Sequence, residues 1–441
     1  SLTPRALIHA LHTRAAGLNG EFNLFIHLCS EEQLEPYLAG LDAKSPAELP
    51  LYGVPFAIKD NIDLAGIPTT AACPAFAYVP ERSATIVEQL IALGAIPLGK
   101  TNLDQFATGL NGTRSPYGEC RNSVHPDYPS GGSSAGSALA VALGVASFAL
   151  GTDTAGSGRV PAALNNLVGL KASKGLISTA GVVPACRSLD CVTYFTATAH
   201  EASQLLALTA RFDARDEYSR SNPLWNDGSA FGTPRPVFRF GVPTQLEFLG
   251  CPESPSLFAA TIEHLQAMGG VAVPIDFAPF LEAARLLYAG PWVAERYSVA
   301  GALIEQHPFA VLPVIKAVLE KAPFVSGVET FRAQYRLQAL KRLCDEAGRP
   351  RLWADSRLPA SGNPGRTARR ADAAQFGSGL LHQLHEHARL RCRGGAGGFY
   401  GQWPALGRHA VWPGVYRPVP AQSGQRLATS DATAPVRPAR T

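Results

Sequence analysis

The sequence predicts a layered α/β fold, because helical patterns alternate along the chain with short apolar runs. Two such runs, Val54 to Ile58 and Ala95 to Gly99, have the length and apolarity of buried strands. Nearly half of the 441 residues (46%) are apolar, so the chain can bury a large core. By its length it is either two or three domains of average size or one large α/β unit.

Helix signals separate these apolar runs. Residues 1–45 have periodic apolar positions and mixed charge, which predicts surface helix throughout. Ser83 is expected to cap a helix whose apolar residues fit a 3.6-residue period over 86–93, and Gly94 is expected to end it.

Two loops of small residues, 131–137 and 151–159, flank an apolar run from Ser137 to Leu150. The run predicts one buried helix that is too short to cross a bilayer. Ser133 and Ser134 stand where side chains cap a helix N-terminus. We therefore expect this helix to bring two serine-containing loops together as the floor of an active site.

The net charge of +4 does not indicate a nucleic-acid or membrane partner. Residues 354–441 hold 12 arginines, no lysine and 4 acidic residues, so residues 1–353 carry 27 basic against 31 acidic side chains. No apolar run predicts a membrane-spanning helix, and no N-terminal signal is present. The eight cysteines form no Cys-x-x-Cys pair, which predicts reduced thiols rather than disulfides or a zinc site. We therefore expect a soluble cytoplasmic protein without a metal.

Lys59 is the candidate base for a serine nucleophile. A serine hydroxyl attacks a carbonyl only when a base accepts its proton, and no histidine lies in the serine-rich stretch. Because Lys59 follows the apolar run 54–58, burial would lower its pKa and allow the neutral amine to act as that base. The alternative is an ordinary lysine at a strand end, with its ammonium in water.

The second small-residue loop also has two interpretations. Small side chains allow several backbone N–H groups to converge on a developing oxyanion, or they simply permit a tight turn. Asp153 and Arg159, at the two ends of this loop, are expected to form a buried ion pair that braces it.

The sequence resembles the amidase signature family of Ser-Ser-Lys hydrolases in three elements that occur in the same order. They are Lys59, GGSSAGS at 131–137 and GTDTAGSGRVPA at 151–162. The intervals fit as well, with 74 residues from Lys59 to Ser133 and 24 from Ser133 to Ser157. The resemblance implies an α/β fold with a central mixed β-sheet covered by helices on both faces.

The same resemblance assigns roles to individual residues. Ser157 would be the nucleophile, and Ser133, following a cis peptide bond, would relay its proton to Lys59. The oxyanion hole would be formed by backbone N–H groups of the second loop, namely those of Thr154, Ala155, Gly156 and Ser157.

Within the family, the sequence is most similar to enzymes that hydrolyse allophanate. The segments that carry this similarity are 51–63, 69–78, 99–118, 181–191 and 286–297. The last one contains Tyr288 and Arg296, which match the substrate-binding pair of those enzymes, and an arginine fork suits a carboxylate. The alternative is that Arg296 is a surface helix residue paired with Glu295 or Asp276. The resemblance further implies a small-molecule substrate, no cofactor and a homodimer.

The prediction divides the chain into an amidase domain, 1–352, and a tail, 353–441, whose composition is poor material for a core. Codons can be chosen for the tail so that the same DNA, read in a frame shifted by one base, encodes a sequence like that of the family. We therefore hypothesise a frameshift near Trp353. Three histidines of the tail, which mimic a metal cluster, receive no weight; they are His382, His385 and His387.

Three other interpretations stay open. The chain could be an amidase with a different substrate, or an inactive product of a decayed gene. It could also be an esterase with Ser134 as the nucleophile of a G-x-S-x-G motif, but that motif requires a preceding strand and the sequence before it is turn-like.

Overall fold

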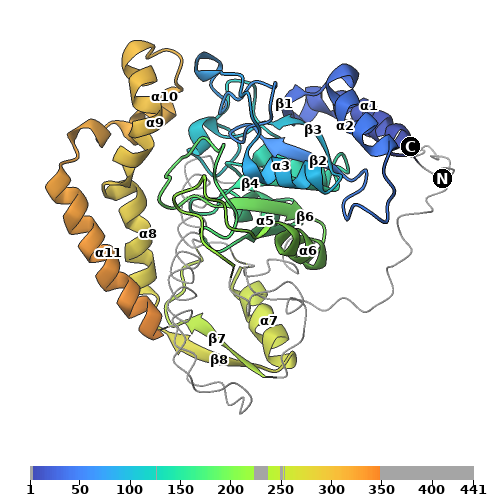
Figure 1. Ribbon diagram of the computed structural model, residues 1–441. Helices are drawn as coiled ribbons and strands as arrows, with labels where there is room; N and C mark the ends of the chain where they lie inside the picture. Colours follow the sequence, from blue (N-terminus) through green and yellow to red (C-terminus); the bar gives the residue numbers. More distant parts are fainter. Residues whose placement is uncertain (1–2, 126, 223–236, 249–251, 253, 348–441) are drawn as a thin grey trace, which may run out of the picture.

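The computed structural model describes residues 3–125, 127–222, 237–248, 252 and 254–347, and it is organised around a six-stranded mixed sheet (Figure 1). The strands are β1 (Phe25–Leu28), β2 (Pro55–Lys59), β3 (Ile96–Thr101), β4 (Phe148–Thr152), β5 (Val168–Lys171) and β6 (Val192–Thr196). Their order in the sheet is β1-β3-β2-β4-β6-β5. β2 is parallel to both of its neighbours, β3 and β4, and all other neighbours are antiparallel.

Helices cover both faces of this sheet. They are α1 (Pro4–Phe22), α2 (Glu31–Asp42), α3 (Thr85–Ala92), α4 (Ala135–Ala142), α5 (Arg159–Leu164) and α6 (Ala199–Thr209). α4 packs across the central strands, whereas α3 and α6 contact each other in front of the sheet in Figure 1. Every residue of β2, β3, β4 and β6 is buried, although successive side chains point to opposite faces. The predicted fold class is confirmed.

A further group of elements follows the sheet in the sequence. It comprises β7 (Phe238–Pro243), α7 (Ser254–Ala267), β8 (Gly270–Ile275), α8 (Ala278–Ala289), α9 (Trp292–Gln306), α10 (Pro313–Leu319) and α11 (Gly327–Ala347). Short 3-10 helices lie at Pro74–Phe76, Gln105–Ala107 and Ala322–Phe324. Apolar residues of α9 and α10, such as Val293 and Ile315, share one cluster with Phe106 and Val183. This packing holds α9 against loops that follow the central strands.

The apolar run from Ser137 to Leu150 is not the single helix that the sequence predicts. α4 ends at Ala142, Gly144 has a φ of 65°, and the end of the run belongs to β4. A positive φ suits glycine and ends a helix. Because a short apolar run looks the same in a buried helix and in a buried strand, periodicity alone does not locate this boundary.

Two smaller predictions are also wrong. Residues 1–45 contain the strand β1 between two helices, because four residues are too few to show a strand period. α3 begins after Ala84 without a side-chain cap, since the Ser83 Oγ accepts a hydrogen bond from the Ala65 N–H at 2.9 Å instead. The predicted end of this helix is confirmed, as Gly94 follows it with a φ of 97°.

The parallel strands bring chemically active side chains to one edge of the sheet. β2, β3 and β4 run in the same direction, so their carboxyl ends meet there, as in other open α/β sheets. β2 ends at Lys59 and β4 ends at Thr152. A fully buried ion pair between Lys100 Nζ and Asp60 Oδ1, at 3.0 Å, ties the ends of β3 and β2 together.

The predictions about membrane spans, metal ligands and cysteines can be checked only within the described residues. Within them, no helix is both long and apolar enough to cross a membrane, and no three His, Cys, Asp or Glu side chains are grouped as metal ligands. Six of the eight cysteines are described, and these six are free and buried. The tail 353–441, with its histidines, lies outside the described residues.

Candidate active site

Lys59 is completely buried at the carboxyl end of β2. Its Nζ donates to Ser133 Oγ at 2.8 Å and to Thr152 Oγ1 at 2.7 Å. The alternative of a strand-end lysine with its ammonium in water is therefore wrong. The structure joins two of the three residues that the sequence singled out, across 74 positions of the chain.

Burial lowers the pKa of Lys59 from 10.5 to about 7. The negative charges of Asp104, Asp190 and Asp153 raise this pKa and the positive charge of Arg296 lowers it, but the loss of hydration outweighs all of them. Both of the hydrogen bonds that Lys59 makes go to neutral hydroxyl oxygens. The neutral amine that a general base requires is therefore available near neutral pH.

The first small-residue loop presents Ser133 through a cis Gly132–Ser133 peptide bond, as the resemblance implies. The Gly132 N–H donates to the Leu110 carbonyl at 2.8 Å, and the Ser133 carbonyl accepts from the Asp104 N–H at 3.0 Å. A Cβ on Gly132 would lie 2.2 Å from Asp104 Oδ2, so only glycine fits this close approach. The segment 104–112 thus holds the Ser133 peptide in place.

Ser134 has a structural contact instead of the features of a nucleophile elbow. Its buried Oγ donates to the Thr152 carbonyl at 3.2 Å and accepts from the Thr152 N–H at 3.3 Å. The residues described between 122 and 134 form no strand, so the G-x-S-x-G interpretation lacks its required context. Ser134 also does not cap α4 through its side chain, although it stands at the N-cap position.

The two serine loops meet, as predicted, but through their backbones. The Ser134 N–H donates to the Ser157 carbonyl at 3.3 Å, and both residues are buried. Ser157 lies in the loop between β4 and α5, immediately after the strand that carries Thr152. The sheet edge thus brings together Lys59, Ser133 and the Ser157 backbone. The nucleophile role of Ser157 stays a prediction.

Asp153 organises the second loop. Its carboxylate accepts from Arg159 Nε at 2.8 Å, from Lys171 Nζ at 3.2 Å, and from the N–H groups of Gly156 and Gly158. Burial raises the pKa of the Asp153 carboxyl, but the two cations outweigh it and hold the pKa well below its usual range. The predicted buried ion pair between Asp153 and Arg159 is confirmed.

The residues predicted to form the oxyanion hole differ in their contacts. The Gly156 N–H donates to Asp153 Oδ1, so it is engaged within the loop. The Thr154 hydroxyl donates to Asp190 Oδ1, which ties the loop to the segment before β6. The oxyanion role of Thr154, Ala155 and Gly156 stays a prediction.

Arg296 is buried on α9, with 4% of its surface exposed. Its Nη1 donates to Thr108 Oγ1 at 2.9 Å, and its guanidinium carbon lies 5.2 Å from the centre of the Tyr288 ring. Glu295 is occupied elsewhere, because it accepts from the N–H and the hydroxyl of Ser188 at 2.7 Å. Asp276 accepts from the Ala278 N–H at 2.9 Å, and the alternative of a surface arginine paired with Glu295 or Asp276 is therefore wrong.

Sequence reasoning missed several residues of this site. Thr152 accepts from Lys59 and from Asn61 Nδ2, the latter at 3.3 Å, and Thr108 holds Arg296. Asn61 lies in the turn directly after β2, two residues from Lys59, and this nearness in the chain could have found it. Thr108 shows no such signal, because its contact with Arg296 spans 188 residues.

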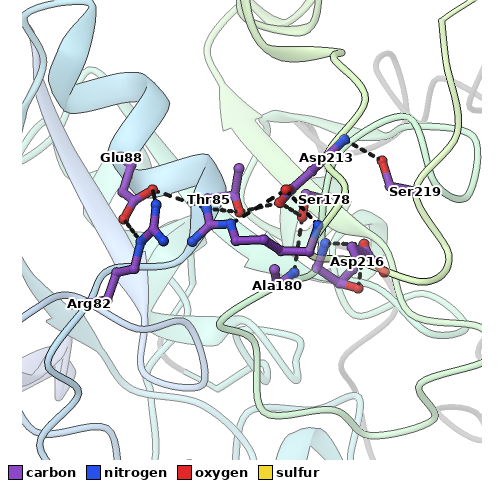
Figure 2. Close-up of polar contacts among 10 residues, drawn as sticks. Arg82, Thr85, Glu88, Ser178, Ala180, Asp213, Asp216 and Ser219 are labelled. Atoms are coloured by element: carbon purple, nitrogen blue, oxygen red, sulfur yellow. Dashed lines mark hydrogen bonds and ion pairs between the residues drawn. The ribbon is translucent and has the colours of Figure 1, made fainter.

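A cavity of about 240 Å³ lies beside the site and is lined by Thr179, Ala180, Gly181, Val182, Pro184, Arg187, Asp190 and Arg215. Figure 2 shows the polar contacts of residues next to this lining, where Asp213 accepts from Thr85 and Ser178. In the same network, Asp216 Oδ2 accepts from the Thr179 N–H at 2.6 Å. The cavity meets the second small-residue loop, 151–159, through Asp190, whose carboxylate also accepts from the Thr154 hydroxyl.

A family model described as Amidase matches residues 6–340. The chain belongs to the amidase signature family. Among curated members of this family, urea amidolyase of Saccharomyces cerevisiae is 47% identical over 334 residues, which is 73% of this chain and 18% of the relative. Urea amidolyase of Lachancea kluyveri is 47% identical over 329 residues, with the same shares of the two chains covered.

Solved structures of amidase signature enzymes are similar to this fold. The allophanate hydrolase of Kluyveromyces lactis has a TM-score of 0.73 and 41% identity, and the match covers 78% of this chain and 57% of that one. The urea amidolyase of the same yeast has a TM-score of 0.71 and 39% identity, with 78% of this chain and 22% of that one covered. The chain thus spans about a fifth of the curated urea amidolyases and just over half of the solved allophanate hydrolase.

Proposed function

We propose that this chain hydrolyses the terminal amide of allophanate, releasing ammonia and a carboxylated carbamate. Its similarity to proteins named urea amidolyase and allophanate hydrolase supports the substrate. The geometry around Lys59 supports the class of reaction. Amide hydrolysis by a serine requires a base that is neutral at working pH, and Lys59, with a pKa of about 7, meets this requirement.

The single observation that carries the proposal is the state of Arg296. No carboxylate among the described residues forms an ion pair with its guanidinium, and its buried Nε has no hydrogen-bond partner. A buried charge without a direct ion-pair partner is costly, so such a site favours an anionic ligand. Allophanate supplies that anion, because its carboxylate matches the planar fork of an arginine. The Tyr288 ring, which faces the guanidinium, would complete this end of the site.

The proposed reaction begins with proton transfer. Lys59 takes a proton from Ser133, and Ser133 takes one from Ser157. The Ser157 oxygen then forms a bond to the terminal carbonyl carbon, and backbone N–H groups of the loop stabilise the oxyanion. The carbon–nitrogen bond breaks, and the proton returns from Lys59 through Ser133 to the leaving ammonia.

Water resolves the acyl-enzyme by the same route. Lys59 and Ser133 accept a proton from the water molecule as it attacks the acyl carbon. The bond to the Ser157 oxygen breaks, and the proton returns to that oxygen. The relay, the loop amides and water are sufficient for both halves of the reaction.

The test is ammonia release by the purified 441-residue chain from allophanate and from biuret, its neutral analogue. Allophanate should be turned over and strongly preferred. Ser157→Ala should abolish the activity, whereas Ser147→Ala, at an exposed serine, should leave it unchanged. Equal rates on both substrates would indicate an amidase of different specificity. A folded chain that hydrolyses no amide would overturn the proposal in favour of an inactive product.

We also propose that the amidase domain occupies residues 1–352, that the chain forms a homodimer, and that it acts in the cytoplasm. The family match over residues 6–340 supports the first point. The six cysteines among the described residues are buried and form no disulfide, which suits a reducing compartment. Light scattering of the purified protein tests the dimer, and a monomer at all concentrations would contradict it.

A further inference from the structure

Asp190 connects two separate segments of the candidate site through hydrogen bonds of its carboxylate. It lies two residues before the first residue of β6 and is buried. Its Oδ1 accepts from the Thr154 hydroxyl, and its Oδ2 accepts from the N–H groups of Ala185 at 2.7 Å and Cys186 at 3.1 Å. Since both oxygens receive hydrogen bonds from N–H and O–H donors, the geometry is that of an ionised carboxylate.

The charge of Asp190 acts on two functional groups at once. It raises the pKa of Lys59 against the larger effect of burial. Burial raises the pKa of Asp190 above its usual value, against the hydrogen bond from Thr154 and the nearby positive charge of Arg296, which lower it. Asp190 therefore lies within electrostatic reach of both the base and the substrate-binding guanidinium.

Two other aspartates act on Lys59 but have different contacts. Asp153 bonds within its own loop and to Arg159 and Lys171. Asp104 accepts from the N–H groups of Gly112 and Arg114, in the segment that holds the Ser133 peptide. Of these three carboxylates, Asp190 is the one that holds a side chain of the catalytic loop from outside that loop.

We propose that Asp190 is a positioning residue for the hydrolysis: it fixes Thr154, and with it the loop that presents Ser157, and it stabilises Arg296 and the protonated state that Lys59 reaches when it accepts a proton. The inference rests on the proposed function. It assigns a role to a residue that contacts neither Lys59 nor Ser133 directly.

The test compares three variants. Asp190→Asn removes the charge and one acceptor, and Thr154→Val removes the hydroxyl while it keeps the charge of Asp190. Asp216→Asn is the matched control, because Asp216 is also a buried aspartate that accepts backbone and hydroxyl hydrogen bonds, those of Thr179. The hydrogen bonds of the Asp216 carboxylate go to Thr179 and Tyr218, which lie outside the loop 153–158 (Figure 2).

Two readouts are measured for each variant as a function of pH. The first is kcat and KM for allophanate. The second is the rate at which a fluorophosphonate probe modifies Ser157, followed by mass spectrometry of the intact protein. The probe requires the base and the loop but not the natural substrate, so it separates a failure of this inference from a wrong choice of substrate.

Thr154→Val should lower kcat and the labelling rate about 10- to 100-fold, because small displacements of an oxyanion loop are costly. The acidic limb of its pH–rate profile, where the rate falls as Lys59 becomes protonated, should stay at the wild-type pH. Asp190→Asn should lower both rates and also move the limb to lower pH, since the charge that stabilises protonated Lys59 is lost. Asp216→Asn should keep the wild-type rates and pH limb.

Several results would overturn the inference. One is a soluble Thr154→Val variant with wild-type labelling. Another is an Asp190→Asn variant that loses rate without any shift of the limb, because a purely structural defect would do the same. A wild-type chain that the probe does not label would overturn both this inference and the proposed function. Labelling without allophanate turnover would refute only the substrate.

Discussion

Replacement of Arg296 by methionine tests the substrate assignment through an effect on binding rather than on folding. Methionine keeps an unbranched apolar side chain on α9 but removes the positive charge that the proposal pairs with the allophanate carboxylate. Loss of one partner of a buried, hydrogen-bonded charge pair costs about 2–5 kcal/mol. At about 1.4 kcal/mol per factor of ten, kcat/KM for allophanate should fall roughly 30- to 5,000-fold.

The stability of the free protein should respond much less than the activity. The substitution removes the hydrogen bond to Thr108 and the contact with the Tyr288 ring, which contribute about 1–3 kcal/mol each. It also removes a buried charge that has no ion-pair partner among the described residues, and burying such a charge costs several kcal/mol (~3 or more). Because these two opposing contributions are of similar size, we expect the free energy of unfolding to change little.

The assay is steady-state ammonia release from allophanate and from biuret, together with urea denaturation. Arg285→Met on α8 is the control, because Arg285 is exposed and undergoes the same chemical change. The reasoning is refuted if Arg296→Met retains more than about a tenth of the kcat/KM for allophanate. It is also refuted if biuret hydrolysis falls by the same factor, since biuret has no carboxylate to lose.

Two further substitutions test the relay and the loop. Lys59→Met should lower kcat about 100- to 10,000-fold on any amide, because it removes the general base; near-normal turnover at about pH 8 would exclude that role. Asp153→Asn should lower the free energy of unfolding by about 3–5 kcal/mol in urea titrations, because it leaves Arg159 and Lys171 buried without their counterion; a loss below about 1 kcal/mol would show that the pair does not brace the loop.

The sequence was informative wherever one short segment determines the local structure. The apolar run before Lys59 predicts a buried strand with lysine at its end, and β2 has this form. Gly94 ends α3 because its φ of 97° is unfavourable for other residues. The small residues between Asp153 and Arg159 allow these two side chains to meet within one loop. Each of these features depends on neighbouring residues alone.

Features that depend on distant parts of the chain were missed or misplaced. The boundary between α4 and β4 is set by how the run 137–150 packs on the sheet, and its composition is equally apolar on both sides. Thr108 supports Arg296, and Asp190 supports Thr154, through contacts that connect separate loops. Polar residues of this kind look like ordinary turn residues until the fold brings their partners together.

The central claim is that Lys59 is a buried, neutral amine at working pH. The most direct measurement is a pH titration of the Nζ-bearing carbon of Lys59 by NMR, in protein labelled at its lysines and assigned by the signal that Lys59→Met removes. The account predicts a pKa of about 7, matched by kcat/KM values that rise with pH through the same point. A Lys59 signal that titrates near its ordinary value of 10.5, or a rate that does not change between about pH 6 and 9, would contradict it.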